Sequence, residues 1–241
     1  YLGFDGDMGL NLALRTLLRR NVVHTMTVTL RRRAVEEVGD FDPKYPPCED
    51  WDLWLRIAEH RKVVGDARPW GRTRVHEGGI SANPIVVYTQ GCKVLAAAAA
   101  RLSARESPHA GFAHRQAARW HVKLGRRLAR AGRTEEAEAH WRKAVELLGD
   151  APELDPTLAT ARAMLAGTEA ENGRLDEAAL DACTALAAAE GQPTTETVCL
   201  AVLARVSFGR REYATAMALM RLAVAKARVA EPEPGALSFG L

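Results

Sequence analysis

Residues 49–56, with the sequence Glu-Asp-Trp-Asp-Leu-Trp-Leu-Arg, form the densest run of side chains that could do chemistry. Apolar side chains follow at the i, i+3, i+4 and i+7 spacing of one helix face: Trp51, Trp54, Leu55 and Ala58. Glu49, Asp50 and Asp52 then fall in the first turn, where the helix dipole favours negative charge, and Asp52 can pair with Arg56 along the exposed side. This leaves Asp50 at the helix N-terminus as a candidate proton acceptor. The alternative, in which the acidic residues only cap the helix, stays open.

A second candidate group is basic and lies at residues 72–76. Arg72, Arg74 and His76 stand at i, i+2 and i+4 of an expected extended segment, so their side chains project from one face. Guanidinium groups bind phosphate oxygens bidentately, and a neutral imidazole can ligate a divalent ion, so this face suits a diphosphate and its metal. A structural His76 is the alternative. A zinc hydrolase that uses His76 and Glu77 is a weak hypothesis, because the two residues make no ligand set.

Helices and short strands are expected to position these groups. Residues 22–30 alternate threonines with His24, Met26, Val28 and Leu30, which is typical of a strand and favours a core position for His24. Arg32 follows this segment, where it could reach a phosphate or an acceptor, or form an ion pair beside the next helix. Further elements are expected as helices at residues 10–18 and 85–104, extended segments at residues 62–64 and 72–76, and a linker at residues 103–111.

Four motifs occur in the order seen in one enzyme family. Residues 21–32 resemble a strand that ends in paired arginines, residues 34–42 a short helix with its Gly-Asp-Phe-Asp turn, residues 49–56 the acidic helix, and residues 74–81 an Arg-x-His-x-Gly ending. Together they resemble the C-terminal half of the catalytic domain of family 2 glycosyltransferases, inverting enzymes of GT-A fold. The resemblance runs from about residue 10 to about residue 90. It implies an α/β partial GT-A domain, a short mixed sheet with helices, over residues 1–90.

The resemblance also implies a mechanism. A nucleotide-sugar donor would give its sugar to a glycan or another hydroxyl acceptor, with Asp50 as the catalytic base and Glu49 orienting the helix mouth or an acceptor hydroxyl. A Mg or Mn ion with His76 as a ligand would act on the diphosphate. Substrate-binding roles would fall to four residues: Arg74, Arg72, Trp51 and Arg32.

The donor-binding half is expected to lie outside this chain. Asp5-Gly6-Asp7 spells the D-x-D of such enzymes, but four preceding residues are too few for a nucleotide-binding βαβ unit, and a turn before a helix is favoured. Because the sequence begins at Tyr1 without a methionine, we expect an N-terminally truncated enzyme that is inactive alone.

The second half of the chain repeats itself. Residues 132–137, 173–178 and 209–214 share a Gly-Arg-x-[Asp/Glu]-x-Ala pattern, at separations of 41 and 36 residues. The pattern resembles tetratricopeptide repeats, about three of them. The third repeat is ambiguous, because Ala216, Met220 and Ala223 fit better two residues along. The expected organisation is residues 1–90 as transferase, 91–111 as helix and linker, 112–230 as all-α repeats for a protein partner, and 231–241 as a tail.

Composition, charge and cysteine spacing indicate which classes of protein this chain does not resemble. The 241 residues are 47% hydrophobic and 26% charged, and the net charge of +3 is too small to indicate nucleic-acid binding. Four cysteines without paired spacing indicate free thiols in a reducing compartment. No apolar run of transmembrane length is seen, so a cytoplasmic protein is expected, with peripheral membrane association left open. The alternative to the enzyme is a non-catalytic repeat scaffold carrying a transferase remnant.

Overall fold

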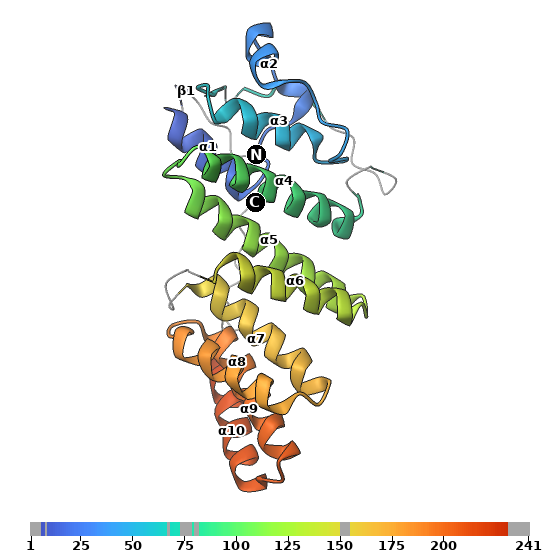
Figure 1. Cartoon of the computed structure of the whole chain (residues 1–241), viewed down its shortest axis with the longest axis vertical. Helices are drawn as coiled ribbons and strands as arrows, with labels where there is room; N and C mark the ends of the chain where they lie inside the picture. Colours follow the sequence, from blue (N-terminus) through green and yellow to red (C-terminus); the bar gives the residue numbers. More distant parts are fainter. Residues whose placement is uncertain are drawn as a thin grey trace. The chain divides into compact units, whose positions relative to one another are not determined.

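The computed structural model describes residues 6–7, 9–66, 68–72, 79, 82–149 and 155–230 (Figure 1). The chain divides into two compact units, residues 1–124 and residues 125–241, and the division falls inside helix α5 (Ala110–Arg130). We call them the N-terminal and the C-terminal unit and describe each by itself.

The α/β fold class predicted for the first 90 residues is wrong. The described part of the chain is almost entirely helical, with ten α-helices. Its strands are β1 (Gly6–Asp7) and β2 (Val64–Gly65), which pair antiparallel with Gly6 opposite Gly65. Strands of two residues each are too short to build the sheet of an α/β domain, which needs several longer strands. The D-x-D sequence accordingly contributes Gly6 and Asp7 to a strand pair, while Asp5 lies outside the described residues.

The strand predicted at residues 22–30 is also not formed. This segment joins α1 (Gly9–Arg19) to α2 (Arg32–Val38) and contains a single 3₁₀ turn, η1 (Thr25–Thr27). The Thr27 hydroxyl donates to the His24 carbonyl oxygen at 2.8 Å, a local bond that competes with strand pairing. His24 is exposed, so the expected core position for this histidine is wrong. The period-2 pattern was real, but no neighbouring strand pairs with it in the described part of the chain.

Helix α3 (Glu49–Ala58) is the central element of the N-terminal unit. The predicted apolar face is confirmed, because Trp51, Trp54, Leu55 and Ala58 are all buried. Leu53 is buried as well, since α3 packs against α1, α2 and α4 (Pro84–Ala104). Burial on several sides holds the N-terminus of α3 in one place, which is what a site built there requires.

Helix α4 confirms the helix predicted at residues 85–104. The Asn83 side chain accepts hydrogen bonds from the Ile85 and Val86 amides, and Pro84 occupies the first helical position, both strong helix-start features. By length and composition α4 could also cross a membrane, which the sequence did not lead us to expect. This is a weak indication, because the core helix of a soluble protein passes the same test.

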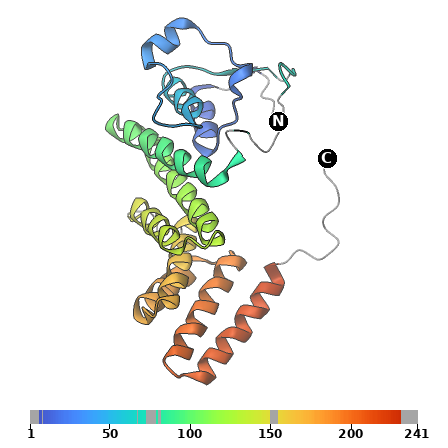
Figure 2. The same cartoon turned by 90° about the vertical axis from the view of Figure 1, so that its right-hand side faces the viewer.

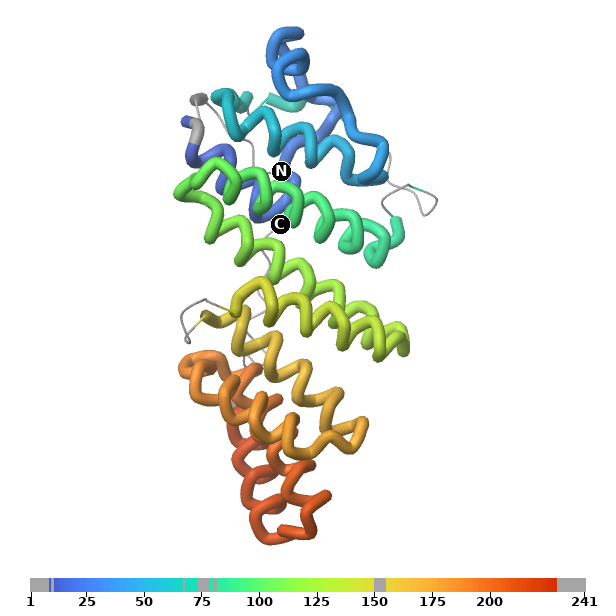
Figure 3. Tube along the Cα trace, in the orientation of Figure 1, coloured from blue at the N-terminus to red at the C-terminus, as the bar shows by residue number. Residues whose placement is uncertain are grey.

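The C-terminal unit is a series of helices, and short turns at residues 172–174, 189–192 and 210–212 join the last four of them (Figures 2 and 3). Each of α7 (Pro156–Glu171), α8 (Leu175–Ala188) and α9 (Pro193–Gly209) packs against its successor, the last of them against α10 (Tyr213–Ala230). The helices of this unit that follow α5 are α6 (Thr134–Leu147), α7 (Pro156–Glu171), α8 (Leu175–Ala188), α9 (Pro193–Gly209) and α10 (Tyr213–Ala230).

Backbone conformation resolves the ambiguous third repeat. Gly132, Gly173 and Arg211 have positive φ angles of 75°, 77° and 64°, and the helices α6, α8 and α10 each begin two residues later. Gly209 instead ends α9. The third turn therefore lies two residues beyond the Gly-Arg pattern, and Ala216 of α10 becomes the counterpart of Ala137 and Ala178. All three alanines are buried.

Candidate functional site

The N-terminus of α3 carries a carboxylate that other segments hold in place. The Asn21 side-chain amide donates to Asp50 Oδ1 at 3.2 Å, and the Thr25 hydroxyl donates to Asp50 Oδ2 at 2.8 Å. The Trp51 backbone N–H also donates to Oδ1, at 2.6 Å. Both oxygens of this partly buried carboxylate are thus oriented by neutral donors. No ion pair to Asp50 is found among the described residues.

The neighbouring carboxylate, Asp52, has a different environment. Its side chain is 2% exposed and forms ion pairs with Arg56 at 2.8 Å and Arg101 at 3.3 Å. The predicted Asp52–Arg56 pair is confirmed, but the expectation that it lies on the exposed side is wrong, because α4 covers it and supplies Arg101. Arg56 also donates to the carbonyl oxygens of Val38 and Asp40, at the end of α2. Asp52 is therefore held by two arginines and has a structural role, whereas no ion pair holds Asp50 in the described part of the chain.

Glu49 and Cys48 lie beside Asp50 at the N-terminus of α3. Glu49 Oε2 is buried and has no hydrogen-bond partner among the described residues. Burial, and after it the charges of Asp50 and Glu49, raise the pKa of the Cys48 thiol to about 11. Cys48 Sγ donates to the Val87 carbonyl oxygen on α4 at 3.7 Å. A thiol of this kind stays protonated at neutral pH and is a poor nucleophile.

Trp51 lies in the core rather than at a surface. Its side chain is 1% exposed, its indole N–H donates to the Leu17 carbonyl oxygen at 2.8 Å, and its ring lies 4.7 Å from that of Trp120. In this structure Trp51 fixes the position of α3 next to Asp50. It offers no face on which a sugar could stack.

The predicted basic and metal-binding residues are only partly described. Arg32, the first residue of α2, and Arg72 are both exposed. Arg74 and His76 lie outside the described residues. Within the described ranges, no three His, Cys, Asp or Glu side chains form a group that could hold a metal ion. The metal thus stays a prediction that rests on the resemblance.

Sequence reasoning missed Asn21 and Thr25. Thr25 was assigned only to a strand face, and Asn21 only to the start of a motif. Their bonds to Asp50 join positions 29 and 25 residues apart, so no local period could have revealed them. The one available signal was the order of the motifs, because it placed residues 21–32 and 49–56 in the same domain.

In the C-terminal unit, Arg174 of the Gly-Arg pattern has a structural role. Its guanidinium group donates to Glu138 Oε1 at 2.6 Å, and the Asn172 amide donates to Glu138 Oε2 at 3.3 Å. These bonds tie the turn between α7 and α8 to helix α6.

No protein-family model, curated protein or solved structure matches the chain.

Proposed function

We propose that the N-terminal unit carries the acceptor-activating part of an inverting glycosyltransferase, with Asp50 as its catalytic base. One observation carries the proposal: both Asp50 oxygens are held by neutral donors while the adjacent Asp52 is neutralised by arginines. The order of the four motifs, which resembles that of family 2 glycosyltransferases, supports it.

The chemistry requires one group that accepts a proton. As the acceptor oxygen bonds to the anomeric carbon, the bond from that carbon to the nucleoside diphosphate breaks on the opposite face, and the hydroxyl proton passes to an Asp50 oxygen. The side chains of Asn21 and Thr25 fix the direction of those oxygens without neutralising them. Glu49 precedes Asp50 at the N-terminus of α3, where we expect it to orient the start of the helix or an acceptor hydroxyl.

The diphosphate needs positive charge as it leaves. Arg72 is exposed and available for this role, and Arg74 is expected to share it. A divalent ion, if bound through His76, would supply further charge stabilisation there. Since the described residues do not form a metal site, no step above depends on one.

The test uses the complete protein encoded by the gene. Hydrolysis of and transfer from a panel of nucleotide sugars would be measured with Mg or Mn, beside binding of the nucleotide. We expect Asp50→Asn to lower turnover by about 10²–10⁴-fold, the usual contribution of a general base, with nucleotide binding retained. Glu36→Gln, the same change of an exposed carboxylate on α2, is the matched control and should keep full turnover. Equal turnover in wild type and Asp50→Asn would refute the role of Asp50.

A second candidate function, a helical scaffold without catalysis, is favoured by the exposed apolar side chains of α10, which include Met217 and Met220 at 58% and 46% exposure. It would be supported by a complete protein that neither binds nor hydrolyses any nucleotide sugar.

A further inference from the structure

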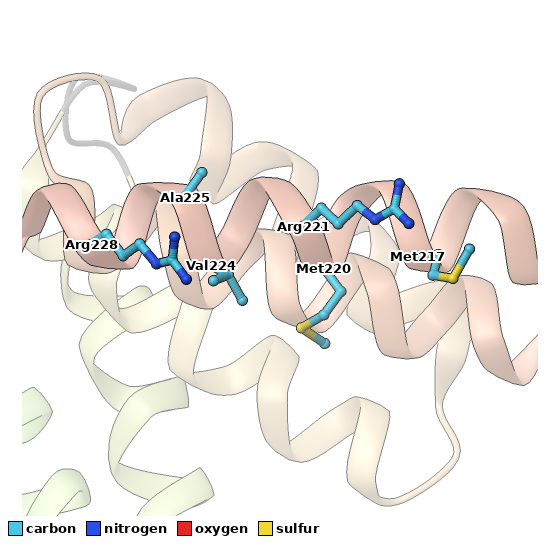
Figure 4. Close-up of a pocket in the computed structure, with 6 residues that line it drawn as sticks. All are labelled: Met217, Met220, Arg221, Val224, Ala225 and Arg228. Atoms are coloured by element: carbon cyan, nitrogen blue, oxygen red, sulfur yellow. The ribbon is translucent and has the colours of Figure 1, made fainter.

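Helix α10 has an exposed apolar stripe along one side. Its core-facing residues, Ala216 and Ala223, are buried, whereas Met217, Met220 and Val224 are 58%, 46% and 46% exposed. The stripe lines a shallow groove of about 290 Å³ together with Arg221, Ala225 and Arg228 (Figure 4). Exposed methionines at helical spacing are typical of surfaces that bind another helix.

The preceding repeat shows what covers such a stripe. Because Leu175 begins α8 and Tyr213 begins α10, Ala179, Ala182 and Leu186 are the counterparts of Met217, Met220 and Val224. Ala182 is fully buried in a cluster that contains Val202 and Val206 of α9 beside two alanines of α7, and Leu186 packs against a cluster that contains Cys199 of α9 and an alanine of α7. On α8, then, these positions are covered by a helix.

The charges on α10 indicate the chemistry of the helix that would cover it. Residues 213–230 contain no Asp or Glu, and Lys226 is already paired with Glu196 of α9 at 2.5 Å. Arg221 and Arg228 border the groove, and no ion pair to either is found in the part of the chain that the structure describes. A second copy of α10 would bring these arginines against their own equivalents, a repulsive arrangement. Acidic side chains beside an apolar stripe would complement them.

We propose that the α10 groove binds an amphipathic helix of another protein, one that carries Asp or Glu beside its apolar stripe. The apolar stripe of the bound helix covers Met217, Met220 and Val224, as α9 covers α8, and its carboxylates pair with Arg221 and Arg228. This site is independent of the proposed transferase chemistry.

The test uses the 241-residue chain and two synthetic peptides. Both have the sequence of residues 193–209, the helix that covers α8. The acidic peptide carries Ala201→Glu, Arg205→Glu and Phe208→Glu, and the basic peptide carries Ala201→Lys, Arg205→Lys and Phe208→Lys. Binding is followed by fluorescence anisotropy, and helix content of every protein variant is checked by circular dichroism. We expect the acidic peptide to bind at least about tenfold more tightly than the basic one.

Protein variants separate the apolar contribution to peptide binding from the contribution of the arginine charges. Met220→Glu should weaken binding of the acidic peptide by about tenfold or more, as expected for a residue at the centre of an interface. Leu180→Glu, at a 70% exposed leucine on α8, should not change binding. Arg221→Glu with Arg228→Glu should reverse the preference between the peptides. No binding of either peptide, or equal binding of both, would overturn the proposal. So would self-association of the wild-type chain that Met220→Glu abolishes, because a second copy would then fill the groove.

Discussion

The indole rings of Trp51 on α3 and Trp120 on α5 lie 4.7 Å apart, centroid to centroid, and Gly91 of α4 lies against both. A Cβ atom at position 91 would come within 2.6 Å of Trp120 Cε3 and 3.0 Å of Trp51 Cζ3. The close approach of three helices behind Asp50 therefore depends on a residue without a side chain.

Gly91→Ala should destabilise the N-terminal unit. The added methyl group must displace an indole ring packed in the core, and overpacking of this kind costs about 1–3 kcal/mol. This destabilisation is measured as a change in the free energy of unfolding, obtained from urea titration. Gly111→Ala is the matched control, since a Cβ at that exposed position of α5 would meet nothing within 4 Å. It should stabilise by about 0.5–1 kcal/mol through helix propensity. Equal effects of the two variants would contradict the packing described for Gly91.

Arg101→Gln should also destabilise the chain. Arg101 on α4 pairs with Asp52 at 3.3 Å and Glu59 at 2.9 Å, and both carboxylate side chains are nearly fully buried. Loss of hydrogen bonds to charged groups predicts about 2–3 kcal/mol, because Arg56 and Arg105 still neutralise part of the charge. Arg33→Gln, which breaks the exposed Arg33–Glu37 pair, is the control and should cost little, because solvent screens an exposed ion pair. A loss for Arg101→Gln as small as that of the control would show that the network contributes little.

The four cysteines should differ in reactivity. Burial raises the pKa of the Cys48 thiol to about 11 and those of Cys92 and Cys199 to about 12, whereas Cys183 is exposed. A raised pKa leaves little thiolate at neutral pH, so the buried thiols should react slowly. We expect iodoacetamide to modify Cys183 first in the native protein and all four in the unfolded chain, as read by mass spectrometry. Early modification of Cys48 would contradict the structure of the helix mouth.

Glu169 of α7 should make stability depend on pH. Its carboxyl is buried, and burial, with the charge of Asp181, raises its pKa above the ordinary value of 4.5. The folded state then binds the proton more tightly than the unfolded state, so this group costs stability above its folded pKa. The cost disappears as the pH falls below 4.5.

The variant Glu169→Gln removes this dependence. We expect it to raise the melting temperature by about 2–4 °C near neutral pH, which corresponds to about 1 kcal/mol in a chain of this size. The gain over wild type should shrink on acidification, as measured by calorimetry. Glu171→Gln removes the same charge from an exposed position of α7 and controls for net charge. A gain that grew on acidification would reverse the sign of the argument.

Most helices could be predicted from the sequence because their causes are local. The apolar spacing of Trp51, Trp54 and Leu55 and the cap at Asn83 act within one or two turns, and α3 and α4 form as expected. The repeated helix–turn–helix pattern was equally visible. Positive φ at Arg211 was not, because an arginine gives no sign of the left-handed backbone that a glycine suggests.

Tertiary structure decided whether residues 22–30 form a strand and which side chains surround Asp50 and Asp52. A period-2 pattern at residues 22–30 favours a strand only if another strand lies beside it, and here the threonine hydroxyls bond locally and to Asp50 instead. Asp50 and Asp52 stand two positions apart in one acidic run, yet Asn21 and Thr25 hold the first, and Arg56 and Arg101 neutralise the second. The sequence by itself determined the helices whose apolar spacing and caps are local, such as α3 and α4. Only packing between distant segments decided which carboxylate pairs with arginines and which is held by neutral donors.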